Sequence, residues 1–271
     1  MPCYNKASLY GVRLLFRGKR APGRSGLAFY GPSGVFMEIR ELISKSPIRA
    51  FEDALDGGLG RGNLGVLVSQ HGVGKSACMV HLALDKIIQD LNVVHVSFGA
   101  NVEHMMNWYK EVFREITDFR SLEDAVDVYE TIRRNRVMMN FSQENTSVET
   151  ILNSLETLIK QGSFKADAIF FDGYKLTVAA EEDVRKIKQF AQDMNVEVWF
   201  SVSPVRPDVQ FDEYGVPESM NPYKPIIDVL VGLHYNDERS RVIMTIVKCK
   251  DRDIPRPSGV SLDPKTMLIE G

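Results

Sequence analysis

The chain has 271 residues, a net charge of −3 and 44% hydrophobic residues, which is enough apolar material for one sizeable core with short additions. No apolar run approaches the roughly 20 residues that a membrane-spanning helix needs, so we expect no membrane role. The three cysteines are scattered and odd in number, which argues against a disulfide framework and favours a reducing, cytoplasmic location.

The first 36 residues differ in composition from the rest of the chain. They carry six Lys or Arg and no Asp or Glu, and they are rich in Gly, Pro and Ser without a sustained period. We interpret residues 1–36 as a basic, disordered tail or as a wrongly assigned start ahead of Met37; the composition also resembles a transit peptide superficially. An overall charge of −3 with +6 in this segment leaves −9 for residues 37–271, the predicted globular domain.

Residues 64–85 read as a hydrophobic strand, a glycine-rich turn and a helix. The turn fits the phosphate-binding pattern G-x-x-x-x-G-K-[ST] except that Ser69 replaces the first glycine. In that pattern backbone N–H groups and the helix N-terminus hold phosphates, the lysine reaches the β and γ oxygens, and the hydroxyl binds Mg²⁺. An ordinary strand-to-helix turn is the alternative. The predicted ATP contacts are Ser69, Gln70, His71, Gly72, Val73, Gly74, Lys75, Ser76 and Ala77, with Ser76 also a Mg²⁺ ligand.

Strands and helices alternate through the middle of the chain. A serine cap and Glu149 mark the start of one of these helices, and we expect the methionines and Trp108 of another to face the core rather than a cofactor. The patterns predict strands at 93–98, 137–141, 167–173 and 196–203 and helices at 101–116, 121–135, 147–161 and 181–194. This alternation predicts a mostly parallel sheet covered by helices on both faces.

Asp172 ends the apolar run of residues 167–171. A buried parallel strand places such a carboxylate at the carboxyl edge of the sheet. A Walker B aspartate holds Mg²⁺ from that position, so we predict that Asp172 does the same. The alternative is a structural aspartate that caps the following turn.

The C-terminal third of the chain has a different pattern. Residues 204–224 hold four of the twelve prolines and predict a long surface loop. Strands at 228–235 and 241–248 follow, joined by a turn at 236–240, and residues 258–269 predict a last hairpin. The predicted fold is therefore α/β, with antiparallel strands added at the C-terminal end.

Residues 46–270 resemble the RecA superfamily of P-loop ATPases, in its KaiC-like and DnaB-like branch. The similar motifs are GGLGRG at 57–62, the strand end VWFSVS at 198–203 and VKCKDR at 247–252. The resemblance implies a RecA-like P-loop core, with catalytic roles for Lys75 in the loop and for Ser203 as a sensor of the γ-phosphate. It also implies that Lys248 and Lys250 reach the ATP of a neighbouring subunit in a ring or filament.

One departure from this family concerns hydrolysis. Where KaiC-like proteins carry one or two glutamates that polarise the attacking water, this chain has Gly99 and Ala100. Without such a group the phosphates keep their electrostatic cradle, but the nucleophile is not oriented. Glu103 is a candidate substitute; its alternative role is to stabilise the N-terminus of the next helix.

Two functions remain from the sequence. The first is an ATP·Mg²⁺-binding protein that uses nucleotide to control conformation or assembly, with weak or absent hydrolysis. The alternative is an active DnaB- or RecA-type ATPase acting on nucleic acid, which the charge of −9 over residues 37–271 does not indicate. A small-molecule kinase fits the motifs less well, and the sequence identifies no protein partner.

Overall fold

A computed structural model describes residues 47–99, 102–120, 130, 132–162, 164–205, 209–250, 252–253, 259–263 and 269–270. The basic segment at 1–36 and most of the predicted helix at 121–135 lie outside these residues. The helices are α2 (Pro47–Ala54), α3 (Lys75–Ile88), α4 (Val102–Arg120), α6 (Val148–Lys160) and α7 (Glu181–Met194), with 3₁₀ turns η1 (Leu176–Val178) and η2 (Glu218–Tyr223). The strands are β1 (Leu64–Val68), β2 (Val93–Ser97), β3 (Arg136–Asn140), β4 (Ala168–Asp172), β5 (Glu197–Val202), β6 (Val229–Tyr235), β7 (Val242–Cys249), β8 (Arg252–Asp253), β9 (Gly259–Leu262) and β10 (Ile269–Glu270).

The described strands form one ten-stranded sheet. Six of them, in the order β3-β2-β4-β5-β1-β6, run parallel. β7, β9 and β10 extend the sheet antiparallel beyond β6, and β8 pairs with β7. The predicted α/β class, the mostly parallel sheet and the antiparallel strands at the C-terminal end are thus confirmed.

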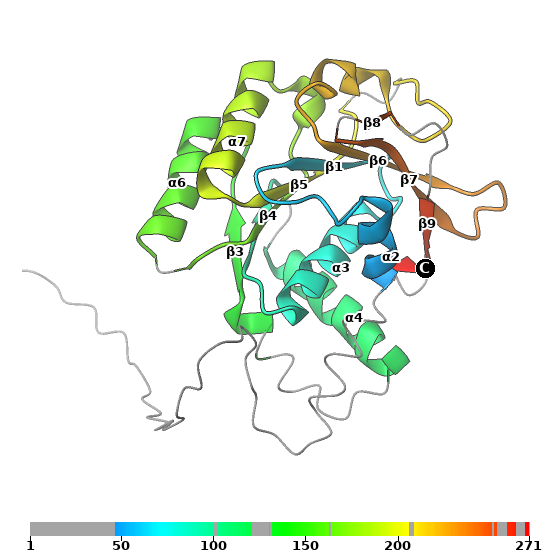
Figure 1. The fold of residues 1–271 in the computed structure, drawn as a ribbon, viewed down its shortest axis with the longest axis horizontal. Helices are drawn as coiled ribbons and strands as arrows, with labels where there is room; N and C mark the ends of the chain where they lie inside the picture. The colour runs from blue at the N-terminus through cyan, green and yellow to red at the C-terminus, as the bar shows by residue number, and fades with distance from the viewer. Residues whose placement is uncertain are drawn as a thin grey trace, which may run out of the picture.

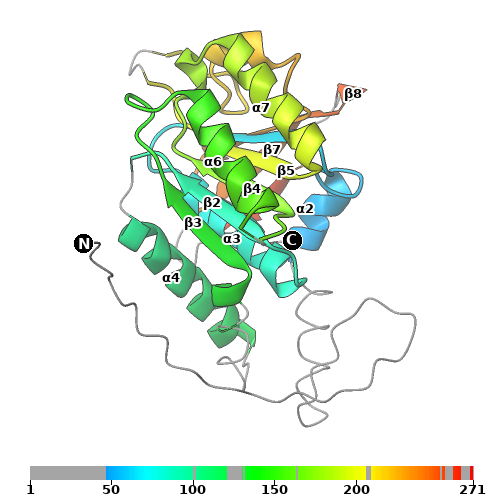
Figure 2. The same ribbon diagram turned by 90° about the vertical axis from the view of Figure 1, so that its left-hand side faces the viewer.

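Helices cover both faces of this sheet, as Figures 1 and 2 show: α6 and α7 lie together on one face, and α3 and α4 lie on the other. Alternation along each strand divides the core accordingly, because successive strand side chains point to opposite faces. In β4, Ile169 and Phe171 join the cluster under α6 and α7, whereas Ala168 and Phe170 join the cluster under α3 and α4. Burial on both faces explains why these strands read as continuous apolar runs.

Gly65 leaves room for the side chain of Trp199 on the neighbouring strand. A Cβ atom at this position would lie 2.5 Å from Cε3 of Trp199, which is paired with Gly65 across β1 and β5. The indole therefore occupies the space that a side chain on β1 would take. It packs there in the cluster under α3 and α4, beside Phe51 of α2.

Two parts of the fold differ from the sequence prediction. α2, eight residues long, is not among the helices predicted from the sequence. Residues 204–224 are not wholly a surface loop, because Met220 and Tyr223 of η2 are buried in the cluster under α6 and α7. Tyr223 also donates a hydrogen bond to the carbonyl of Ala179 (2.7 Å). The prolines and the lack of a regular period concealed this packing.

The structure also bears on two other expectations. Among the described helices, none is both long and apolar enough to span a bilayer. The predicted cap of α6 is confirmed, since the Ser147 hydroxyl accepts a hydrogen bond from the backbone N–H of Thr150. That bond satisfies one of the free donors at the helix N-terminus.

Candidate functional site

The glycine-rich loop connects the end of β1 to the start of α3. Gly72 and Gly74 have φ angles of 79° and 110°, which glycine adopts without the steric cost that other residues meet. Ser69, the residue that departs from the phosphate-binding pattern, is not among the described residues with positive φ. Its backbone N–H instead bonds to the carbonyl of Val202 in β5 (3.2 Å). The loop therefore tolerates a serine at its entry.

Lys75 is drawn back into this loop. Its side chain is 8% exposed, and its Nζ donates to the carbonyls of Ser69 (3.2 Å) and Gln70 (2.7 Å) and to the Ser69 hydroxyl (2.7 Å). Burial lowers the pKa of Lys75 from 10.5 to about 8, and the nearby charge of Asp172 acts in the opposite direction. The loop thus holds a desolvated ammonium group at the N-terminus of α3.

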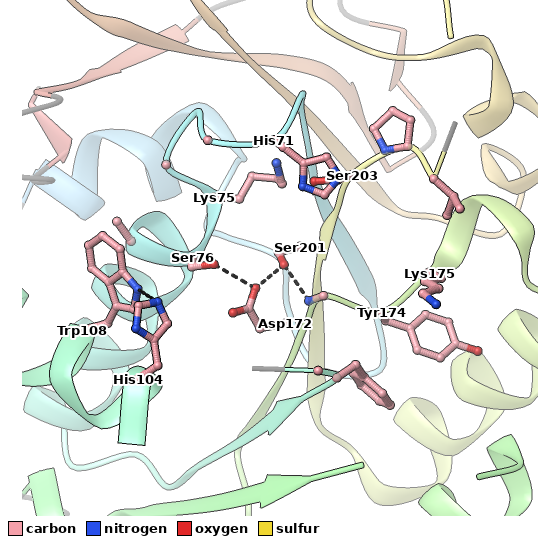
Figure 3. Close-up of a pocket in the computed structure, with 18 residues that line it drawn as sticks. His71, Lys75, Ser76, His104, Trp108, Asp172, Tyr174, Lys175, Ser201 and Ser203 are labelled. Carbon is pink, nitrogen blue, oxygen red and sulfur yellow. Dashed lines mark hydrogen bonds between the residues drawn. The ribbon is translucent and has the colours of Figure 1, made fainter. Parts of the chain in front are cut away.

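Asp172 is the last residue of β4 and is buried at the carboxyl edge of the sheet. Its Oδ1 accepts a hydrogen bond from the hydroxyl of Ser76 (3.2 Å) and another from the hydroxyl of Ser201 in β5. Ser201 in turn accepts a bond from the backbone N–H of Gly173 (3.0 Å). Figure 3 shows this chain of bonds at the centre of the site.

Ser201 was not among the residues predicted from the sequence. It lies opposite Asp172 in the parallel register of β4 and β5. The serines of the run VWFSVS were the available signal, but the prediction chose Ser203, two residues later. Ser203 also lines the site, and no hydrogen bond joins it to Asp172 in the described part of the chain.

These groups surround a cavity of about 750 Å³. Its floor is the glycine-rich loop with Ser76, Asp172 and Ser201, one wall carries His104 and Trp108 of α4, and the other carries Tyr174 and Lys175 (Figure 3). Trp108 also packs against the core under α3 and α4, so the expectation that it faces the core is confirmed only in part. Met105 of the same helix is buried as expected, whereas Met106 is exposed. Of the predicted contacts, those that line the cavity are His71, Gly72, Gly74, Lys75, Ser76, Ala77, Asp172 and Ser203.

The remaining predicted contacts lie close by. Ser69 and Gln70 contact the Lys75 ammonium, as described above. Gln70 and Val73 border a second cavity of about 360 Å³, on the side of the loop that faces β6. There the hydroxyl of Tyr235 lies 3.4 Å from the carbonyl of Gly72.

Lys248 and Lys250 are not brought to this cavity. Lys248 pairs with Leu230 at the start of β6, so both lysines lie at the edge of the sheet opposite the glycine-rich loop. The Nζ of Lys248 donates to the carbonyls of Lys224 (2.6 Å) and Ile227 (2.5 Å). For the Lys250 ammonium the described residues supply no hydrogen bond or ion pair.

The position expected to carry a catalytic carboxylate has an unusual backbone. Gly99 lines the cavity with a φ of 110°, and a Cβ atom there would meet nothing within 4 Å. The space is open, but the conformation is one that other residues rarely adopt. Ala100 lies outside the described residues. Glu103 is exposed in the first turn of α4, where it stabilises the helix dipole, and it is not among the described residues that line the cavity.

Oxygen ligands for a cation converge at one place in the cavity. Among the described residues no group of three or more His, Cys, Asp or Glu side chains is arranged to hold a metal ion. Mg²⁺, however, needs few protein ligands, because it keeps several waters and takes phosphate oxygens. The hydroxyl of Ser76 and the carboxylate of Asp172, 3.2 Å apart, fit this requirement.

The burial of Lys75 predicts a pH-dependent stability. Below pH 8 Lys75 is protonated in both the folded and the unfolded protein, so the folded protein bears the full cost of the buried charge. Between pH 8 and 10.5 Lys75 is deprotonated in the folded protein but still protonated in the unfolded chain. The free energy of unfolding therefore rises with pH in this range. We expect Lys75→Met to be more stable than the wild type at pH 7 by up to about 3 kcal/mol, with a smaller difference at pH 10. Urea unfolding at both values measures this, and a difference independent of pH would contradict it.

Comparison with known proteins assigns the chain to no family. No protein-family model matches it, and no curated protein matches it either. The function of the site is therefore inferred from its own residues and geometry.

Proposed function

We propose that this protein binds ATP·Mg²⁺ in the cavity around Lys75, on a RecA-like P-loop core, and uses the nucleotide to control its conformation or assembly with little or no hydrolysis. One observation carries the proposal: a buried ammonium, a helix N-terminus and a serine–aspartate pair converge on one cavity of about 750 Å³. Each of these features favours one part of a magnesium-bound triphosphate.

The phosphates are held by the loop and by α3. Positive φ angles at Gly72 and Gly74 let the backbone approach an anion closely, and the first amides of α3 add the favourable end of the helix dipole. Lys75 would exchange its bonds to loop carbonyls for bonds to phosphate oxygens, which are stronger because both partners are charged. The negative phosphates also stabilise the positive charge of Lys75, which burial disfavours.

The cation is held by Ser76 and Asp172. A bound Mg²⁺ would neutralise part of the phosphate charge. Ser201 positions the carboxylate, because it donates to Oδ1 of Asp172 while accepting from the N–H of Gly173. The second carboxylate oxygen is left for the cation or for its waters.

Slow hydrolysis is supported by the wall of the cavity. Phosphoryl transfer to water needs a group that orients the attacking water. Among the described residues the cavity contains no carboxylate besides that of Asp172, which is already assigned to the cation. Binding depends mainly on the loop and the cation, so it survives this loss.

Assembly is supported by the position of Lys250. It lies at the far edge of the sheet from its own loop, so it can serve a nucleotide only in another copy of the chain. Lys248 is less available, because its ammonium is held by two carbonyls of its own chain.

Lys75→Ala should abolish ATP·Mg²⁺ binding, with an affinity loss on the order of a hundredfold or more, since charge-assisted bonds to the phosphates disappear. Calorimetry measures the affinity, and circular dichroism verifies folding. Lys165→Ala, exposed at the amino end of β4, is the matched control. Unchanged affinity in a folded Lys75→Ala protein would refute the site.

Asp172→Asn should weaken ATP binding more in the presence of Mg²⁺ than in its absence. The same calorimetry, with the same control, measures this. Equal losses of affinity with and without Mg²⁺ would make Asp172 structural.

ATP turnover should be slow, on the order of a thousandfold below that of related proteins with a positioned carboxylate. Steady-state phosphate release checks this, and Glu103→Gln should leave the rate unchanged. Turnover of several ATP per second would favour the active ATPase instead. Gly99→Glu is not suited to restoring the water-orienting carboxylate, because the φ of 110° strains any side chain placed there.

ATP should promote association of copies, because only a neighbouring chain can bring Lys250 to the phosphates. Light scattering with ATP, with ADP and without nucleotide measures the mass. We expect Lys250→Ala to weaken the ATP-dependent association, whereas Lys165→Ala leaves it unchanged. A monomer under all three conditions would exclude this role.

A further inference from the structure

The pair His104 and Trp108 forms the α4 wall of the cavity that contains Lys75, Ser76 and Asp172. The two residues are four positions apart on the helix, so they lie on the same face. The indole Nε1 of Trp108 donates to Nε2 of His104 (3.1 Å), and the two rings meet edge to face (Figure 3).

This hydrogen bond defines the roles of the two ring nitrogens. An indole N–H can only donate, so Nε2 of His104 accepts with its lone pair. The hydrogen of the ring is then on Nδ1. No described residue accepts a bond from that Nδ1–H. Trp108 is itself packed against the core, so the free donor is held on a fixed wall.

His104 lines the same cavity as Gly99, the position where a catalytic carboxylate was expected. Gly99 contributes no side chain there, and Glu103 does not line the cavity in the described structure. The loop amides and Lys75 are assigned to the phosphates, and His104 lies on the α4 wall of the same cavity. This arrangement directs the terminal phosphate of the proposed nucleotide towards α4. An oxygen of that phosphate is the acceptor that Nδ1–H lacks.

We infer that His104 makes this site specific for a triphosphate: its Nδ1–H donates to the terminal phosphate of the bound nucleotide, and a diphosphate does not reach it. The inference rests on the proposed function and adds the residue that distinguishes ATP from ADP. His104 does not act as a base in this arrangement, because its one lone pair is occupied by Trp108. The pair therefore favours binding of ATP over its hydrolysis.

The test compares ATP·Mg²⁺ and ADP·Mg²⁺ affinities by calorimetry in four proteins. His104→Leu should bind ATP about tenfold to a hundredfold more weakly and ADP within about twofold of the wild type, since one hydrogen bond to a charged group is lost. His104→Asn, whose amide N–H can replace Nδ1–H, should recover most of the ATP affinity. Met106→Ala, an exposed change on the same helix, is the matched control and should change neither.

The outcomes separate the two proposals. Equal loss of both nucleotides in His104→Leu, or no loss of either, overturns the role of His104 while ATP binding by the wild type stands. A wild type that binds neither nucleotide overturns the proposed function itself.

The tautomer provides a readout that a merely structural histidine would not change. Nitrogen NMR of the wild type should show His104 protonated at Nδ1, with a shift of that signal on adding ATP but not ADP. Trp108→Phe keeps an aromatic ring and removes the donor, so the Nδ1–H form and part of the ATP preference should be lost together. A wild type protonated at Nε2, or an ATP preference unchanged in Trp108→Phe, contradicts the inference.

Discussion

The site depends on the parallel pairing of β5 with both β1 and β4. In this register Val202 lies opposite Val68 and Ser201 lies opposite Asp172. Because parallel strands in register end at the same edge of the sheet, the glycine-rich loop and Asp172 emerge side by side, although Ser76 and Asp172 are 96 positions apart. Trp199 contributes to this pairing by occupying the space that Gly65 leaves on β1. A shift of β5 by one residue would turn Ser201 to the opposite face and separate the loop from the carboxylate.

The electrostatics of the site follow from this geometry. The sheet edge buries a lysine and an aspartate beside each other, and each is held by uncharged groups: loop carbonyls for Lys75 and serine hydroxyls for Asp172. Such bonds stabilise the charges without cancelling them. The cavity therefore presents a positive end, suited to phosphate, and a negative end, suited to a cation, and the proposed ATP·Mg²⁺ matches both.

Two positions that line the cavity bear on hydrolysis. Gly99, after β2, offers only its backbone, in a conformation that other residues rarely adopt. On α4, Nε2 of His104 accepts the hydrogen bond from Trp108, so the proposed role of His104 is that of a donor to a phosphate oxygen. This combination fits the proposed response to the bound nucleotide.

Local patterns alone determined much of this protein. Apolar runs and the helical period predicted β4 and α7 within one residue, and the glycine-lysine-serine turn predicted the order of β1, loop and α3, and with them Lys75, Ser76 and Asp172, because these signals depend only on neighbouring residues. Only the tertiary structure decided the strand order β4-β5-β1. The hydrogen bond from Ser201 to Asp172, the place of His104 on the cavity wall and the burial of η2 all depend on which distant segment lies opposite. No local period encodes that choice, since strand pairing and the packing of a helix over an edge are set by the whole core.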